Sequence, residues 1–172
     1  MMERSKSRCG RRRNIMKRIF IFSDTHGSVN GCEAVLRGSK ERVDGVIHAG
    51  DYTRDADSIK AAFPELPVYA VKGNGDLFSR EPQDLTVIID GVRIFITHGH
   101  MYNVKLEYDY RTLREKGREL GAGLIVFGHT HKPYLDWDGD MTVVNPGSAG
   151  YGGTYAVAKI ENGNVRVDMY DI

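Results

Sequence analysis

The residues of this sequence that could do chemistry are seven aspartate, asparagine and histidine side chains, each placed where a short apolar run ends. The apolar runs cover residues 19–22, 46–49, 68–71, 92–96 and 124–127. The side chains that follow them are Asp24, His26, Asp51, Asn74, His98, His129 and His131. They offer nitrogen and oxygen donors without a thiol, which suits Mn, Fe, Co, Ni or Zn better than a soft-metal or iron–sulfur site. The sequence therefore predicts a divalent-metal site.

The spacing of these donors predicts a pair of metal ions. Asp24 and His26 are one residue apart, as are His129 and His131, and alternate side chains of an extended strand point to the same side. A bridging carboxylate from Asp51 would suit two divalent ions about 3.5–4 Å apart, as in two-metal hydrolytic sites. Hydroxide between the ions, from water with a pKa lowered toward about 7, would attack a phosphate ester in line. Two donors would complete the second ion's shell: His98 and the amide of Asn74.

These donors need a framework that brings strand ends to one edge of a sheet, where ligands of α/β proteins collect. We predict helices over residues 31–42, 55–63 and 102–120. A β-hairpin is predicted over 85–89 and 92–96, because Asp90-Gly91 between them is a strong type I′ turn signal. Further strands are expected over 141–144, 155–159 and 165–169. This order favours the α/β class, as a multilayer α/β sandwich of two mixed β-sheets flanked by helices.

The motifs and their order resemble the calcineurin-like metallophosphoesterase superfamily. They are Asp-x-His, Gly-Asp, Gly-Asn-x-Asp, Thr-His-Gly-His and Gly-His-Thr-His. With the short chain and Asn145-Pro146-Gly147-Ser148, they are similar to small bacterial and archaeal phosphodiesterases of the YfcE/MJ0936 type. The resemblance implies a β-sandwich flanked by helices and two divalent ions, Mn²⁺ foremost, with Ni²⁺, Fe²⁺, Co²⁺ or Zn²⁺ as alternatives. It implies one metal on Asp24, His26, Asp51 and His131, and the other on Asp51, Asn74, His98 and His129.

One position departs from the superfamily pattern. Gly75 stands where many members have a histidine and the small phosphodiesterases often have a cysteine. His100, two residues beyond His98, is our candidate general acid, and Asp51 and Asn74 are the other residues expected to take part in catalysis. Loss of a general acid matters most for poor leaving groups, so Gly75 favours activated or diester substrates, or slow turnover.

Two further polar residues near the motifs are expected to support the structure. His48 lies inside the second apolar run, so we interpret it as a core residue or one that supports a metal ligand. Asp76 follows the Gly-Asn-Gly turn and is expected to stabilise it. Residues 145–148 are expected to form a backbone turn, either near the metals or as a plain Pro-Gly turn.

Length and composition favour one domain over residues 16–172 of this 172-residue chain. Residues 1–15 carry six basic side chains against Glu3, a net charge of +5, while the whole chain has a formal charge of +1. We expect this basic arm to be disordered. No apolar run approaches the roughly 18 residues of a membrane helix. Cys9 and Cys32 lack metal-site spacing, so the expected compartment is a reducing cytoplasm.

Three kinds of function fit the sequence. The leading prediction is an enzyme, a metal-dependent phosphodiesterase acting on a small phosphate ester or nucleotide. A phosphomonoesterase or a nuclease could use the same two ions, and a non-catalytic protein-binding scaffold of the Vps29 type would have the same fold with a degraded metal site. A scaffold has no need to keep all seven donors. Nucleic acid is a less favoured partner, no membrane partner is expected, and a homo-oligomer is left open.

Overall fold

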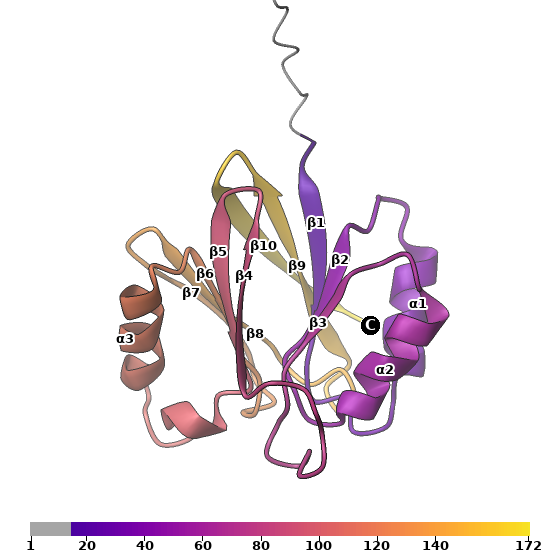
Figure 1. Ribbon diagram of the computed structural model, residues 1–172, viewed down its shortest axis with the longest axis horizontal. Coiled ribbons are helices and arrows are strands. Elements are labelled where there is room, and N and C mark those ends of the chain that lie inside the picture. Colours follow the sequence, from indigo (N-terminus) through magenta and orange to yellow (C-terminus); the bar gives the residue numbers. More distant parts are fainter. Residues whose placement is uncertain (1–14) are drawn as a thin grey trace, which may run out of the picture.

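The computed structural model describes residues 15–172, which form two five-stranded β-sheets packed face to face, with helices on the outer faces (Figure 1). The strand orders are β10-β9-β1-β2-β3 and β4-β5-β6-β8-β7. The multilayer sandwich of two mixed sheets that the sequence predicts is confirmed. The first sheet contains β1 (Lys17–Phe22), β2 (Gly45–His48), β3 (Val68–Ala70), β9 (Thr154–Glu161) and β10 (Asn164–Asp171). The second contains β4 (Asp84–Ile89), β5 (Val92–Thr97), β6 (Leu124–Val126), β7 (Pro133–Asp138) and β8 (Met141–Pro146).

The central strands β1 and β2 of the first sheet are buried on both faces, as the unbroken apolar run of β1 predicts. Ile19 and Ile21 face the core between the two sheets, whereas Phe20 and Phe22 pack against the helical layer. That layer consists of α1 (Asn30–Gly38) and α2 (Thr53–Ala62). The strands β1, β2 and β3 are parallel. Their carboxyl ends therefore reach the same end of the sandwich.

The second sheet repeats this arrangement with the helix α3 (Arg111–Leu120) on its outer face. Ile94 and Ile96 of β5 face the inter-sheet core, while Phe95 packs with Leu113 of α3. The strands β5, β6 and β8 are parallel, and β4 and β7 pair antiparallel at the edges. The predicted hairpin is confirmed, because Asp90 and Gly91 both have positive φ, 44° and 83°, as a type I′ turn requires.

The predicted helix over residues 102–120 is wrong in its first half. A short 3-10 helix, η1, covers His100–Tyr102, and α3 begins only at Arg111. Asn103 and Tyr110 have positive φ values of 55° and 53°, which a continuous α-helix cannot contain. The Glu107 carboxylate accepts hydrogen bonds from the backbone N–H and hydroxyl of Thr112, at 2.7 and 2.6 Å. This contact satisfies a free N–H of the first turn and fixes the late start of α3.

Other predicted helix and strand boundaries differ from the structure by a few residues. The first helix ends at Gly38 rather than at residue 42, and the second begins at Thr53 rather than at residue 55. The sequence analysis missed β7, whose first residue is Pro133 and whose side chains mix apolar and acidic types. Proline is tolerated at the start of an edge strand because no ladder partner needs its missing N–H.

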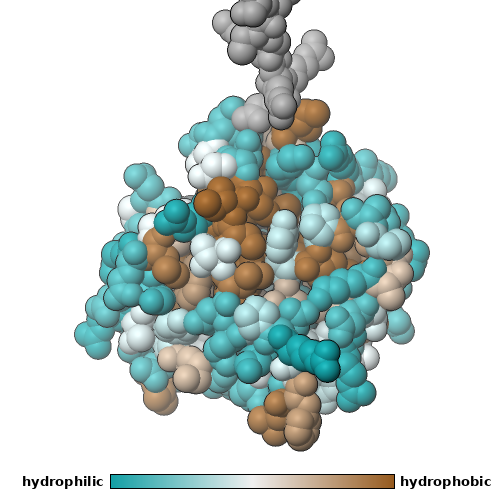
Figure 2. Space-filling view, viewed as in Figure 1, coloured by the Kyte–Doolittle hydropathy of each residue, from teal (hydrophilic) through white to brown (hydrophobic). Residues whose placement is uncertain are grey.

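One edge strand of each sheet, β3 and β4, faces the viewer in Figure 1, and hydrophobic surface gathers on this face in Figure 2. Tyr69 of β3 and Val87 of β4 are partly buried against the inter-sheet core there. The basic arm expected over residues 1–15 falls almost entirely outside the described residues. Within residues 15–172, no helix has both the length and the apolar character needed to cross a membrane.

Candidate metal centre

The candidate donors lie just beyond the ends of parallel strands, in turns with an unusual backbone. Five of them have positive φ values between 48° and 69°: Asp24, His26, Asp51, His129 and His131. The prediction that Asp24 and His26 point to one side because they alternate along an extended strand is wrong. Both side chains instead project from a left-handed turn, a conformation that aspartate, asparagine and histidine adopt more readily than most residues. Such strain is common at functional sites because surrounding contacts must hold it.

The turn after β1 is held by contacts from distant parts of the chain. The Asp24 N–H donates to the carbonyl of Gly50 at 3.0 Å, and the Asp24 carbonyl accepts the Ser148 hydroxyl at 2.8 Å. The Gly150 N–H donates to the same carbonyl at 3.3 Å. The segment 145–148 therefore lies against the candidate site, as one of its two interpretations predicted, although its first two residues end strand β8 and only Gly147 and Ser148 lie beyond it.

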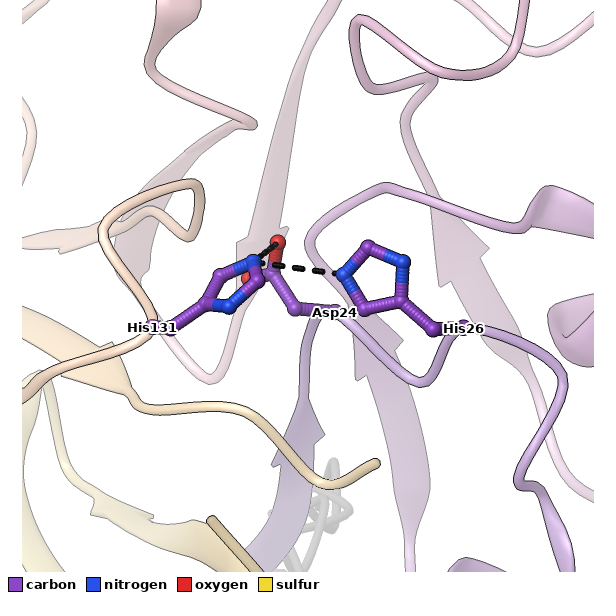
Figure 3. A group of neighbouring side chains, drawn as sticks. All are labelled: Asp24, His26 and His131. Atoms are coloured by element: carbon purple, nitrogen blue, oxygen red, sulfur yellow. Dashed lines mark hydrogen bonds and ion pairs between the residues drawn. The ribbon is translucent and has the colours of Figure 1, made fainter. Parts of the chain in front are cut away.

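The first group of donors consists of Asp24, His26 and His131, which point toward one another from the loops after β1 and β6 (Figure 3). The Nε2 atoms of the two histidines are 3.2 Å apart, and His131 Nε2 lies 3.1 Å from Asp24 Oδ1. Asp24 is fully buried, whereas the His131 side chain is 38% exposed. This group therefore opens to solvent on its histidine side.

The second group consists of Asp24, Asp51 and His98, all buried. His98 Nε2 lies 3.6 Å from Asp51 Oδ2 and 3.9 Å from Asp24 Oδ1. His98 Nδ1 lies 2.7 Å from the Ala49 carbonyl oxygen, which can only accept, so Nδ1 carries the hydrogen. When the ring is neutral, its Nε2 lone pair therefore faces the two carboxylates, an orientation common among metal-ligating histidines.

Unpartnered polar atoms show that these residues fit a cation. Asp24 Oδ1 and His98 Nε2 are buried and form no hydrogen bond within the described part of the chain. A buried acceptor without a partner is costly, and a divalent cation among these atoms would remove that cost. Asp24 is the carboxylate common to both groups, whereas the spacing of the donors in the sequence predicted that Asp51 would bridge two ions.

Asp51 is set in place by the turn after β3. The Gly75 N–H donates to Asp51 Oδ1 at 2.9 Å, and Asp76 stabilises this turn by accepting from the Gly73 N–H at 2.9 Å. Burial alone would raise the pKa of Asp51, but the nearby His98 ring and the hydrogen bond from the Gly75 N–H hold this pKa below its ordinary value. Asp51 is therefore ionised at neutral pH, the form that binds metals.

The other predicted residues lie around these two groups. The His129 ring meets the His98 ring edge-on, with centroids 5.0 Å apart, and the backbone N–H of His129 donates to Asp24 Oδ2 at 3.1 Å. Burial and the neighbouring His98 lower the pKa of His129 to about 4, so its ring is neutral at pH 7. Asn74 is exposed in the turn after β3, and residues 15–172 give its side chain no hydrogen bond. The structure thus brings five predicted donors together and leaves Asn74 at the rim.

His100 lies behind His98, at a centroid distance of 5.5 Å. Its Nε2 lies 2.9 Å from the Gln83 amide nitrogen, and Nδ1 is buried without a hydrogen-bond partner in the described structure. If the amide donates, the neutral ring carries its proton on Nδ1. Burial and His98 lower the pKa of His100. Its role as general acid stays a prediction.

Several supporting residues were not predicted as part of the site. The Ser23 hydroxyl donates to Asp24 Oδ2 at 2.5 Å, and Thr25 pairs with the buried His48 at 3.0 Å, which confirms the supporting role expected for His48. Tyr52 and Tyr151 flank His26 at centroid distances of 5.3 and 4.9 Å. The Ser-Asp-Thr-His order could have suggested the two hydroxyls, but nothing in the sequence placed the tyrosines.

The chain is similar to known proteins of one family. Residues 16–163 match the calcineurin-like phosphoesterase superfamily domain. The probable metallophosphoesterase YsnB of Bacillus subtilis is 31% identical over 162 residues, 89% of this chain and 90% of that protein. The phosphodiesterase MJ0936 of Methanocaldococcus jannaschii is 27% identical over 151 residues, 76% of this chain and 82% of that protein.

Solved structures share the same fold. A predicted phosphoesterase of Streptococcus pneumoniae gives a TM-score of 0.76 at 27% identity, over 91% of this chain and 90% of that one. Vacuolar protein sorting 29 of Cryptosporidium parvum gives 0.70 at 17% identity, over 91% and 98% of the two chains, which shows a common fold alone. By sequence, architecture and the donors at its strand ends, this chain belongs to the calcineurin-like phosphoesterase superfamily.

Proposed function

We propose that this protein is a metal-dependent phosphodiesterase that hydrolyses small phosphate diesters or nucleotides with two divalent ions. The observation that carries this proposal is the pair of donor groups that share Asp24, in which Asp24 Oδ1 and His98 Nε2 are buried and form no hydrogen bond within residues 15–172. A relative named as a phosphodiesterase supports the choice of reaction.

The residues that would hold the ions follow the resemblance, with one addition from the geometry. One ion would bind Asp24, His26, Asp51 and His131, and the other Asp51, Asn74, His98 and His129. Asp24 also lies within reach of the second group. Mn²⁺ is the first candidate, although this ligand set accepts several metals. Bound ions would supply Lewis acidity, which acidifies water and neutralises charge on the phosphate.

Side chains of the protein would position the substrate and supply the proton for the leaving group. Asp51, which is anionic, would act by holding the ions, and the exposed amide of Asn74 could donate a hydrogen bond to the reacting phosphate. His100 would donate a proton to the leaving oxygen, because Gly75 has no side chain that could do so. Because the pKa of the half-buried His100 is lowered, little of this side chain is protonated at neutral pH, which favours diesters with good leaving groups.

The test is hydrolysis of bis(p-nitrophenyl) phosphate and p-nitrophenyl phosphate by chelator-stripped protein, titrated with Mn²⁺, Ni²⁺, Mg²⁺ and Zn²⁺. We expect metal to restore diester cleavage, Asp51→Asn to abolish it, and Asp140→Asn to retain it. Asp140 is an exposed carboxylate in the turn between β7 and β8, so it controls for the loss of one charge. A faster monoester reaction would indicate a phosphatase, and absence of both activity and metal binding would favour a scaffold like the structurally similar sorting protein.

A further inference from the structure

A groove of about 800 Å³ opens beside the metal centre, between the start of α2 and the loop that joins β3 to β4. This volume lies within the range of about 300–1,000 Å³ typical of small-molecule sites. The lining residues that matter below are Tyr52, Arg54, Gly75, Leu77, Phe78 and Arg80. We call it the α2 groove.

The α2 groove is continuous with the candidate metal centre through two residues. Gly75 lines the groove and donates its N–H to Asp51 Oδ1 at 2.9 Å. Tyr52 also lines the groove, and its ring meets His26 edge-on at 5.3 Å. Because Gly75 has no side chain, nothing from this position separates Asp51 from the groove. A ligand bound at the metal centre can therefore extend into it.

One side of the groove is formed by apolar and aromatic side chains that do not pack in the hydrophobic core. Leu77 and Phe78 are 83% and 98% exposed, so neither contributes to the core. The loop that carries them forms the lowest part of the molecule in Figure 1, and hydrophobic surface protrudes at the same end in Figure 2. Tyr52 adds a second partly exposed ring. Exposed aromatic rings beside a polar site are suited to stack on a flat ring of a ligand.

The groove also holds two arginines that form no ion pair within residues 15–172, together with three carboxylates, Asp57, Asp76 and Glu81. Neither Arg54 nor Arg80 lies within 4.0 Å of a carboxylate oxygen in residues 15–172, although both are exposed. The three carboxylates are already engaged with other groups. Lys60 Nζ lies 3.5 Å from Asp57 Oδ1 and 2.5 Å from Glu81 Oε1, and Asp76 accepts from the backbone N–H groups of Thr53 and Gly73, both at 2.9 Å. Free guanidinium groups recognise phosphate through paired N–H donors. The groove thus offers a stacking surface and anion-binding groups together.

We propose that the α2 groove binds the part of the substrate beyond the scissile phosphate, and that this part carries a flat aromatic ring and a second phosphate. A short phosphorylated dinucleotide has this chemistry. This inference deepens the proposed function and rests on it, since the metal centre must hold the phosphate to be cleaved. Phe78 and Tyr52 contact the ring, and Arg54 and Arg80 contact the second phosphate.

The test compares two dinucleotides that differ by one phosphate: 5′-phosphorylated adenylyl-adenosine and adenylyl-adenosine. With Mn²⁺-loaded wild-type protein, we expect a lower KM for the phosphorylated form. Arg80→Ala and Arg54→Ala should each raise that KM about tenfold relative to the KM for the other dinucleotide, as expected for lost bonds to a charged group. Phe78→Ala should raise both KM values about tenfold, the size of one lost base–aromatic stack.

Matched controls are Trp137→Ala and Arg166→Ala, an exposed aromatic residue on β7 and an exposed arginine on β10 outside the groove. They should leave the KM ratio unchanged. Equal KM values for the two dinucleotides, or groove variants that behave like the controls, would overturn the inference. If wild-type protein hydrolyses no diester, the proposed function fails. Calorimetric titration of both dinucleotides into chelator-stripped protein then tests separately whether the groove binds a nucleotide. Loss of binding in Phe78→Ala and Arg80→Ala supports a nucleotide site, and no binding by wild-type protein refutes it.

Discussion

Alanine at Gly73 should disable the metal centre, whereas alanine at Gly75 should not. A Cβ at Gly73 would lie 2.0 Å from Asp51 Oδ1 and 2.5 Å from the Asp51 backbone nitrogen. Real Cβ atoms essentially never approach closer than 3.0 Å, so Asp51 or the turn must shift by 3.0 − 2.0 = 1.0 Å or more. A displacement of about 1 Å in a catalytic constellation costs on the order of 100-fold in rate. We therefore expect Gly73→Ala to lose about 100-fold in kcat/KM.

The matched variant is Gly75→Ala, two residues along the same turn. Its Cβ would lie 3.3 Å from Asp51 Oδ1, so the neighbour must yield by only a few tenths of an ångström, and the N–H bond to Asp51 remains. We expect a loss several times smaller than that of Gly73→Ala. The assays are Mn²⁺ affinity by calorimetry and hydrolysis of bis(p-nitrophenyl) phosphate, with melting temperatures to check folding. Equal Mn²⁺ affinity in both variants and wild-type protein would refute the argument that the Gly73 backbone positions Asp51.

Three further outcomes follow from the structure. Mn²⁺ at 100 times its dissociation constant should stabilise the folded protein by about 2.7 kcal/mol, and Asp51→Asn should reduce the resulting rise in melting temperature; an equal rise in both would argue against Asp51 as a ligand. Ser148→Ala removes the hydroxyl that donates to the Asp24 carbonyl, so urea unfolding should show a loss of about 1–3 kcal/mol, and no loss would mean that the strained turn holds without it. Burial raises the pKa of Cys32 from 9.0 to about 12, so the unfolded chain loses this proton at lower pH than the folded chain does. The free energy of unfolding should thus fall between pH 9 and 12, and a Cys32→Ala variant that falls equally steeply would contradict this cause.

Local patterns in the sequence were sufficient to predict most of the fold. Apolar runs such as 19–22 and 124–127 are buried on both faces, and Asp90-Gly91 specifies its hairpin turn through backbone preferences alone. The prediction failed where local preference and tertiary contact disagree. Residues 103–110 have helical composition, but the bonds between Glu107 and Thr112 and two positive φ values end the helical path there.

The sequence by itself determined which residues gather at one end of the sandwich, because parallel strands place their carboxyl ends together whatever their side chains do next. Only the tertiary structure decided how the donors are arranged. Asp24 is the carboxylate common to both groups because its left-handed turn is held by Gly50 and Ser148, residues 26 and 124 positions away in the chain. The α2 groove likewise depends on the packing of α2 beside the loop after β3. Spacing along a chain shows where a side chain leaves its strand, while its final direction depends on contacts between residues far apart in sequence.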